Sequence, residues 1–351
     1  MRLKYKVDIH YQISLNKNIP TSSGQGVNLR MRYSDFSVNS IALSVIGFPL
    51  WTLATKGWGA KDTDLSIYLL QQAFEQGINF FDTADSYGKG YGEELLRESL
   101  SPVRHEIVIS TKFGHDFYSP QLDVDWDGKN FDPSYVAYAC EQSLRRIGTD
   151  YLDMYFVHYP SYAEVENDDL YEALERLVDA GKILNFGIAT DDRPEAAEIA
   201  SLLACERELD LFHTPFSLLE QDLVDIFSQM DRNISVIARR VHSFGLLEES
   251  YDPKIFEESD SSNQINHPVF SKILEMRPNY DFLLEDLEES VPDVALRFAI
   301  TKKNIVSTLP NMADVDHLGQ YCLSADKPDL DSDLMSLIGE VYSDQKADEK
   351  E

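Results

Sequence analysis

Short apolar runs alternate with longer segments of helical periodicity along most of the chain. Eight of these runs are rich in β-branched and aromatic residues, which favours buried strands. We expect strands at residues 41–48, 78–82, 106–112, 152–158, 184–189, 209–213, 235–239 and 304–309. Strands that alternate with helices are typical of α/β folds, and the number eight favours a (β/α)8 barrel of the TIM type over an open doubly wound sheet.

The segments between these runs carry the signals of helices. The clearest ones cover residues 62–77, 92–100, 132–148, 168–182 and 193–208. In the third of them, Asp132 stands at an N-cap position, Pro133 at the first helical position and Gly148 just beyond the last turn. These residue types favour the start and the end of a helix at those places.

Three stretches fall outside the alternation. Residues 1–30 are polar and irregular, so we predict an N-terminal extension, a single barrel domain over residues 31–343 and an acidic tail over residues 344–351. Residues 246–290 are rich in Glu, Asp, Ser and Asn, and they predict a long loop after the seventh strand. Loops that follow barrel strands lie on the face that carries the active site.

The amino-acid composition limits the kinds of molecule that the protein is expected to bind. The chain has 61 acidic and 31 basic residues, a net charge of −30 at pH 7, which repels nucleic acids and anionic membranes. The acidic residues are spread along the chain, which suggests a salt-rich cytoplasm; an ordinary acidic protein is the alternative. We therefore expect a small-molecule partner, and a monomer or small homo-oligomer.

The expected compartment and the expected absence of a metal site rest on sequence features that the chain does not contain. It has no apolar run of about 18 residues, the length that a membrane helix needs, and its first residues have no apolar signal segment. Cys140, Cys205 and Cys322 are far apart and form no CxxC pair. We expect a cytoplasmic protein without disulfides and without a metal site.

Four proton-handling side chains follow consecutive predicted strands. Asp82 ends the second strand, Tyr87 lies in the loop after it, Lys112 ends the third strand and His158 ends the fourth. Each of them alone is more often a cap or a packed residue, but together they predict a site at the carboxyl rim of the barrel. Reduction of a carbonyl needs a proton donor, and an ammonium held by a carboxylate lowers the pKa of a tyrosine from about 10. A histidine can donate a hydrogen bond to the carbonyl oxygen and orient it.

The segments around these residues resemble the aldo-keto reductase family. The resemblance runs from about Met31 to about residue 343, and it is carried by GINFFDTADSYGKGYGEELL (77–96), VISTKFG (108–114), SLRRIGTDYLDMYFVHYP (143–160) and DAGKILNFGIAT (179–190). It implies reversible hydride transfer between NAD(P)H and an aldehyde, ketone or sugar, with the cofactor extended across the barrel rim. The family uses no Rossmann fold, and we interpret the glycines of residues 88–92 as loop flexibility.

The resemblance also assigns cofactor contacts, several of which depart from the family pattern. Ala189 and Thr190 stand where a serine and an asparagine usually hold the nicotinamide carboxamide, His213 replaces a glutamine, and Phe216 replaces the tyrosine that stacks on the nicotinamide. The loop after the seventh strand would wrap the pyrophosphate through Arg239, Arg240, Gly245 and Leu246; a surface salt bridge is the alternative for the two arginines. The adenosine end would contact Pro310, Asn311, His317 and Gln320. Because Asp314 and Asp316 stand where many members carry a basic residue for the 2′-phosphate, NADH is slightly favoured over NADPH.

Other interpretations stay open. The barrel could bind cofactor and regulate a partner with little turnover, as the β subunits of potassium channels show. A metal-dependent barrel hydrolase is disfavoured, because the chain has no HxH pair. The aromatic residues of the loops after the first and third strands either line the substrate site or pack the loops; they are Trp51, Trp58, Phe117 and Tyr118.

Overall fold

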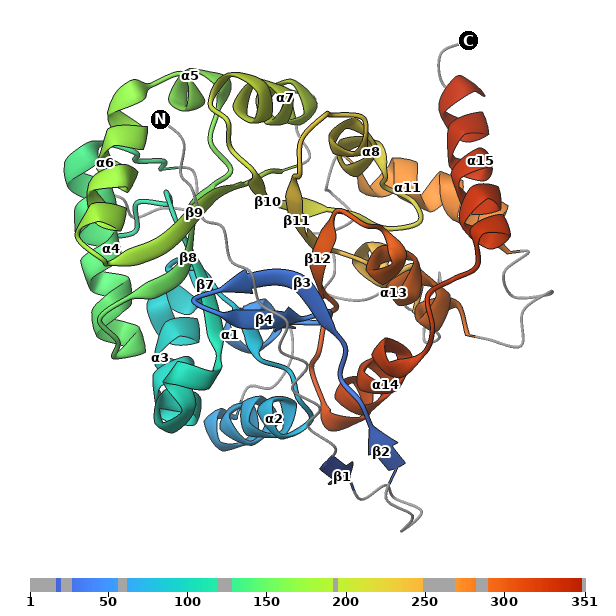
Figure 1. Ribbon diagram of the computed structural model, residues 1–351, viewed down its shortest axis with the longest axis horizontal. Helices are drawn as coiled ribbons and strands as arrows, with labels where there is room; N and C mark the ends of the chain where they lie inside the picture. Colours follow the sequence, from blue (N-terminus) through green and yellow to red (C-terminus); the bar gives the residue numbers. More distant parts are fainter. Residues whose placement is uncertain are drawn as a thin grey trace.

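Eight parallel strands form the centre of the molecule (Figure 1). The computed structural model describes residues 17–19, 27–55, 62–118, 128–191, 195–248, 269–281 and 290–348. The strands are β5 (Phe48–Pro49), β6 (Phe80–Asp82), β7 (Val108–Phe113), β8 (Leu152–His158), β9 (Ile183–Ala189), β10 (Leu211–Pro215), β11 (Ser235–Arg239) and β12 (Ile305–Leu309). A parallel bridge between Ile46 and Thr308 joins the first strand to the last, so the sheet closes on itself. The predicted (β/α)8 barrel is confirmed.

The first predicted strand, residues 41–48, is not one strand. β4 (Ile41–Ser44) pairs with β3 (Tyr33–Val38) in an antiparallel hairpin, and only the residues from Ile46 onward enter the barrel. Asn39 and Ser40 make the turn with φ angles of 48° and 67°, a left-handed pair that suits a tight hairpin. Val38 and Leu43 pack on apolar side chains inside the barrel. The hairpin lies across one end of the barrel in Figure 1, where these contacts seal the interior.

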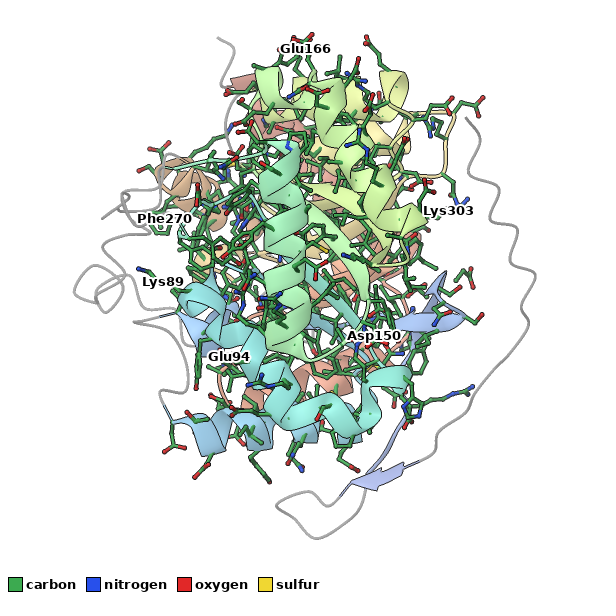
Figure 2. The ribbon with its side chains drawn as sticks, turned by 90° about the vertical axis from the view of Figure 1, so that its left-hand side faces the viewer. Lys89, Glu94, Asp150, Glu166, Phe270 and Lys303 are labelled. Atoms are coloured by element: carbon green, nitrogen blue, oxygen red, sulfur yellow. The ribbon has the colours of Figure 1, made fainter. Side chains whose placement is uncertain are left out.

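Helices surround the barrel. They are α1 (Trp51–Ala54), α2 (Thr63–Glu75), α3 (Tyr91–Leu100), α4 (Pro133–Ile147), α5 (Tyr162–Val165), α6 (Asp168–Asp179), α7 (Ala196–Glu206), α8 (Asp222–Ser228), α11 (Phe270–Met276), α13 (Val291–Thr301), α14 (Val315–Asp326) and α15 (Ser332–Asp348). Figure 2 shows α3, α4 and α6 from outside the barrel, with the exposed Glu94 on α3. α6 is typical, because its buried residues Leu170, Ala173, Leu174 and Leu177 recur at helical spacing.

The five predicted helices are present with shifted ends. α4 begins at Pro133 and ends before Gly148, which is left-handed as expected. Asp132 occupies the N-cap position, but its side chain makes no capping hydrogen bond. Short 3₁₀ turns complete the connections: η1 (Tyr87–Gly90), η2 (Ser101–Glu106), η3 (Ser243–Gly245) and η4 (Arg277–Tyr280).

The predicted N-terminal extension, residues 1–30, and the predicted long loop, residues 246–290, are described in part. In the predicted extension, β1 (Lys17–Ile19) pairs antiparallel with β2 (Val27–Leu29). The predicted long loop, residues 246–290, lies between β11 and α13 and contains α11, while residues 249–268 and 282–289 lie outside the described residues.

Within the predicted acidic tail, residues 344–348 continue α15, which ends at Asp348. The end of this helix is held on the barrel: Asp222 of α8 accepts a hydrogen bond from Tyr342 at 2.9 Å and pairs with Lys346. No helix among the described residues has both the length and the apolar character that a membrane crossing requires.

Candidate active site

Asp82 and Lys112 form a buried ion pair at the carboxyl ends of β6 and β7. Their side chains are 3% and 1% exposed. Lys112 Nζ donates to both carboxylate oxygens of Asp82 at 2.7 Å and to the carbonyl oxygen of Thr83 at 2.7 Å. Ser110, two residues before Lys112 on the same side of β7, donates to Asp82 Oδ1 at 2.6 Å. The ammonium is therefore fixed in position by three acceptors.

The environment of Asp82 keeps its carboxyl group ionised. Burial acts to raise the pKa of this group, but the charges of Lys112 and His213 and their hydrogen bonds outweigh it and hold the pKa well below the ordinary value. The buried pair of Asp82 and Lys112 therefore stays charged, and it holds the positive charge of Lys112 beside Tyr87.

Tyr87 lies beside this pair. Lys112 Nζ is 5.4 Å from the centre of the Tyr87 ring, and the Trp51 ring meets the Tyr87 ring edge-on at 5.6 Å. The turn that places the tyrosine is tight: Gly90 has a φ of 97°, and a Cβ there would lie 2.4 Å from the Arg146 side chain. Glycine is needed at this position for both reasons.

The expected lowering of the Tyr87 pKa is not found. Burial raises the pKa of Tyr87 well above its ordinary value, Tyr159 and Asp82 act in the same direction, and Arg239 acts against them. The hydroxyl is therefore protonated at neutral pH. In this state Tyr87 is a proton donor and not a preformed anion.

His158 completes the predicted set of four. Its ring lies 6.2 Å from the Tyr87 ring and 4.8 Å from the ring of His115, and both contacts are edge-on. Burial lowers the pKa of His158 well below its ordinary value, and the charges of His115, Lys112 and Lys129 add to this effect, so the imidazole is neutral. Neither ring nitrogen has a hydrogen-bond partner among the described residues. A buried, neutral imidazole without a partner can donate a hydrogen bond to a ligand.

His213 lies beside the buried ion pair. Its Nε2 is 3.5 Å from Asp82 Oδ1, and its ring packs edge-on against Phe156 inside the barrel. The contacts of His213 and Ser110 with Asp82 were not predicted from the sequence. Ser110 carried a signal, because it lies on the same face of β7 as Lys112. The structure thus brings together the four predicted residues and adds Ser110 and His213 as contacts of Asp82.

The predicted carboxamide contacts at the end of β9 are buried. Ala189 pairs with both His158 and His213 in the sheet register. Thr190 is also buried, and its hydroxyl donates to Thr214 Oγ1 at 2.7 Å. These residues therefore lie next to His158 and His213 in the barrel.

Phe216 departs from its predicted role. It has no exposed surface, and its ring stacks on Phe298 of α13 at 5.4 Å with an interplanar angle of 9°. A ring whose face is covered by a helix of the outer layer is not an open platform for a nicotinamide. The prediction that Phe216 stacks on the cofactor is therefore not supported, because Phe298 of α13 covers the Phe216 ring.

The loop after β11 is strained. Positive φ angles occur at Arg240, Ser243, Phe244 and Gly245. Such backbone is rare for side-chain-bearing residues and costs of order 1–3 kcal/mol at each, so it is usually kept where function needs it. A Cβ on Gly245 would meet nothing within 4 Å, whereas the Leu246 side chain is buried. The open backbone at Gly245 fits the predicted approach of a pyrophosphate.

The two consecutive arginines differ: Arg239 is the last residue of β11, and Arg240 begins the loop after it. Arg240 Nη2 is 2.5 Å from Glu220 Oε1, and its guanidinium lies over the Phe244 ring at 4.4 Å. Arg239 Nη2 donates to the carbonyl oxygen of Thr190 at 2.8 Å. The salt-bridge alternative therefore holds for Arg240.

The predicted adenosine end is acidic. Pro310 is buried, while Asn311, His317 and Gln320 are partly exposed. His317 stacks on Tyr321 at 5.9 Å, and its Nδ1 is 3.0 Å from Asp314 Oδ2.

Tyr321 also donates to Glu248 Oε1 at 2.9 Å. Burial acts to raise the pKa of Glu248, but His242 and Tyr321 hold it below the ordinary value, so this carboxylate remains charged beside the stacked rings.

The four aromatic residues proposed for the substrate have different positions. Trp51 lies at the site against Tyr87. Tyr118 faces α4, where its hydroxyl accepts a hydrogen bond from Arg146 at 2.6 Å, so packing explains it better than substrate contact. Phe117 packs on Tyr118 at 4.1 Å, and Trp58 lies outside the described residues. Within the described ranges, no three His, Cys, Asp or Glu side chains are grouped as a metal ion would require.

Comparisons with known proteins cover nearly all of this barrel. A family model described as Aldo/keto reductase family matches residues 45–343. The Uncharacterized oxidoreductase YqkF of Bacillus subtilis (strain 168) is 27% identical over 305 residues, which is 84% of this chain and 91% of that protein. The NADH-specific methylglyoxal reductase of Escherichia coli (strain K12) is 22% identical over 89% of this chain and 99% of its own. The solved structure of aldo-keto reductase AKR11C1 from Bacillus halodurans, in its holo form, is similar with a TM-score of 0.72 and 21% identity, over 88% of this chain and 96% of that one.

Proposed function

The chain belongs to the aldo/keto reductase family, an oxidoreductase family, and we propose that it reduces an aldehyde, ketone or sugar carbonyl with NAD(P)H, with Tyr87 as the proton donor. The observation that carries this proposal is the convergence of Asp82, Tyr87, Lys112 and His158 at the carboxyl ends of three neighbouring strands. No observation favours the regulatory alternative, because all four positions keep the groups that turnover needs.

The geometry supports a division of roles. When bound, the nicotinamide supplies the hydride. The neutral His158 would donate a hydrogen bond to the carbonyl oxygen and hold it near the Tyr87 hydroxyl. Tyr87, protonated at neutral pH, would deliver its proton to that oxygen as negative charge develops there.

Lys112 would stabilise the tyrosinate that this transfer leaves behind. Its ammonium is 5.4 Å from the ring centre and is fixed by Asp82, so its charge needs no rearrangement during the step. The raised pKa of Tyr87 favours the donor state, and in the direction of alcohol oxidation the tyrosinate beside Lys112 would accept the proton.

The rim residues fit a nicotinamide dinucleotide in part. Ala189 and Thr190 would meet the carboxamide, and the open backbone at Gly245 would meet the pyrophosphate. Asn311, His317 and Gln320 would meet the adenosine end. Phe216 does not fit its predicted stacking role.

We also propose NADH as the preferred cofactor. The carboxylates of Glu248 and Asp314 lie beside the stacked rings of the adenosine end, and they would repel a 2′-phosphate. The relative named as an NADH-specific methylglyoxal reductase is consistent with this preference.

The test is cofactor binding and turnover with a matched variant. NADH and NADPH are titrated in low and in molar salt while tryptophan fluorescence is followed, and cofactor oxidation is then measured with aldehydes, ketones and sugars. Tyr87→Phe keeps the ring that packs on Trp51 but removes the hydroxyl, so we expect unchanged cofactor affinity and a kcat lower by about 10²–10⁴-fold. Absence of saturable binding of either nucleotide in any salt would refute the proposal.

A further inference from the structure

Arg239 carries a guanidinium that pairs with no carboxylate of the described residues, although the chain is strongly acidic. Its hydrogen bond goes to the carbonyl oxygen of Thr190, and its Nε is buried without a partner among the described residues. Acidic residues outnumber basic ones by 61 to 31, and the adjacent Arg240 does pair with Glu220. A shortage of carboxylates therefore does not explain why Arg239 has none.

Tyr159 brings Arg239 together with a second cation. The guanidinium carbon lies 5.3 Å from the centre of the Tyr159 ring, and Lys129 Nζ lies 5.4 Å from the same point. The two positive groups are thus no more than about 11 Å apart. Tyr159 has a φ of 57°, a conformation that is strained for a tyrosine and that is usually kept where function needs it.

Arg239 and Lys129 lie near His158, the residue that would hold the substrate carbonyl. The Tyr159 ring is 4.3 Å from the His158 ring, and Lys129 Nζ donates to the carbonyl oxygen of His158 at 2.7 Å. The guanidinium carbon of Arg239 therefore lies within about 10 Å of the centre of the His158 ring.

We propose that Arg239, assisted by Lys129 beside Tyr159, binds an anionic group of the substrate, so that the enzyme prefers short carbonyl compounds that carry a carboxylate or a phosphate. This inference rests on the proposed function, since it names the substrate class of the same site. Arginine suits both anions, because its planar fork donates two parallel hydrogen bonds. The local cations also offset the repulsion that a chain of net charge −30 exerts on any anion.

The experiment compares substrates that share a carbonyl and differ in charge. Glyceraldehyde is paired with glyceraldehyde 3-phosphate, and butanal with succinic semialdehyde, at constant ionic strength. We expect the wild-type protein to prefer the anionic member of at least one pair by 10-fold or more in kcat/KM, and the pair that shows the preference identifies phosphate or carboxylate. Arg239→Gln should lower kcat/KM for that anionic member by about 10–100-fold and change the neutral member by less than about 3-fold.

Three variants separate anion binding from other roles. Arg239→Lys keeps the charge without the fork and should recover part of the loss, whereas Lys129→Gln should show a smaller loss than Arg239→Gln. Arg176→Gln removes an exposed arginine of α6 that pairs with Glu172, and it should leave both substrates unaffected. An equal loss for neutral and anionic substrates in Arg239→Gln, or a loss confined to cofactor affinity, would overturn the proposal.

A binding measurement separates this proposal from the proposed function. Succinate and inorganic phosphate are added to the wild-type protein and to Arg239→Gln, with potassium chloride of equal ionic strength as reference, and the melting temperature is measured. An anion-specific rise that is lost in Arg239→Gln would support the anion site even if no carbonyl compound were turned over. Equal melting temperatures in wild type and variant with both anions would overturn the anion site even if neutral aldehydes were reduced.

Discussion

Removal of Lys112 should destabilise the protein far more than removal of an ordinary lysine. Lys112→Met deletes the ammonium that makes three hydrogen bonds of 2.7 Å, and it leaves the Asp82 carboxylate, 3% exposed, with Ser110 as its close donor. Breaking a buried ion pair by deleting one partner costs about 3–5 kcal/mol, because the remaining charge stays buried without compensation. Globular proteins have a total stability of about 5–15 kcal/mol, so the loss should be easily measured.

The assay is urea denaturation at pH 7 in fixed potassium chloride, followed by far-ultraviolet circular dichroism. Lys303→Met, at an exposed position, serves as the control and should change the free energy of unfolding by less than about 0.5 kcal/mol. The double variant Lys112→Met, Asp82→Asn removes both charges and should recover most of the loss. The loss in Lys112→Met should also shrink as the pH falls from 7 towards 5, because without the ammonium burial raises the pKa of Asp82 and protonation then relieves the buried charge.

Two results would refute this reasoning. A loss of less than about 1 kcal/mol in Lys112→Met would mean that the pair is not a buried ion pair in solution. A double variant no more stable than the single one would mean that lost packing, and not the uncompensated carboxylate, causes the effect.

Two further predictions concern pH and salt. Burial lowers the pKa of His213 to about 4 from its ordinary value, so between about pH 6.5 and 4 the unfolded chain binds more protons than the folded one, and stability should fall as pH falls through that window. His213→Asn should show a fall smaller by about 3 kcal/mol over the same window, and parallel curves for both proteins in urea denaturation would contradict this. The net charge of −30 should make the melting temperature rise with potassium chloride from 0.1 to 2 M by roughly several degrees, through screening of self-repulsion. A melting temperature that does not respond to salt would favour an ordinary acidic protein.

The sequence by itself determined most of the barrel and its reactive groups. Apolar runs of strand length that alternate with amphipathic helices leave few folds other than a barrel, and strand ends in such a fold share one rim. Asp82, Lys112 and His158 each lie at or next to the end of a strand, so their meeting with Tyr87 followed from the order of the strands in the chain. Their identities also indicated the chemistry, because a carboxyl group, a phenol, an imidazole and an ammonium are properties of residue type.

The tertiary structure decided what depends on contacts between distant segments. The stretch 41–48 divides between a hairpin and the barrel because Val38 and Leu43 pack inside the barrel end, which no local pattern specifies. Phe216 is turned to Phe298 of a helix about eighty residues later in the chain.

The side chains of the rim show the same dependence. Arg239 and Arg240 are neighbours of the same type, yet Glu220 pairs with Arg240. Arg239 instead lies over the Tyr159 ring, which Lys129 also approaches. Likewise, the pKa of Tyr87 is set by the burial that the surrounding strands and loops produce together. Residue type supplies a charge or a ring, but long-range packing determines its partner and its solvent exposure, and these fix what it does.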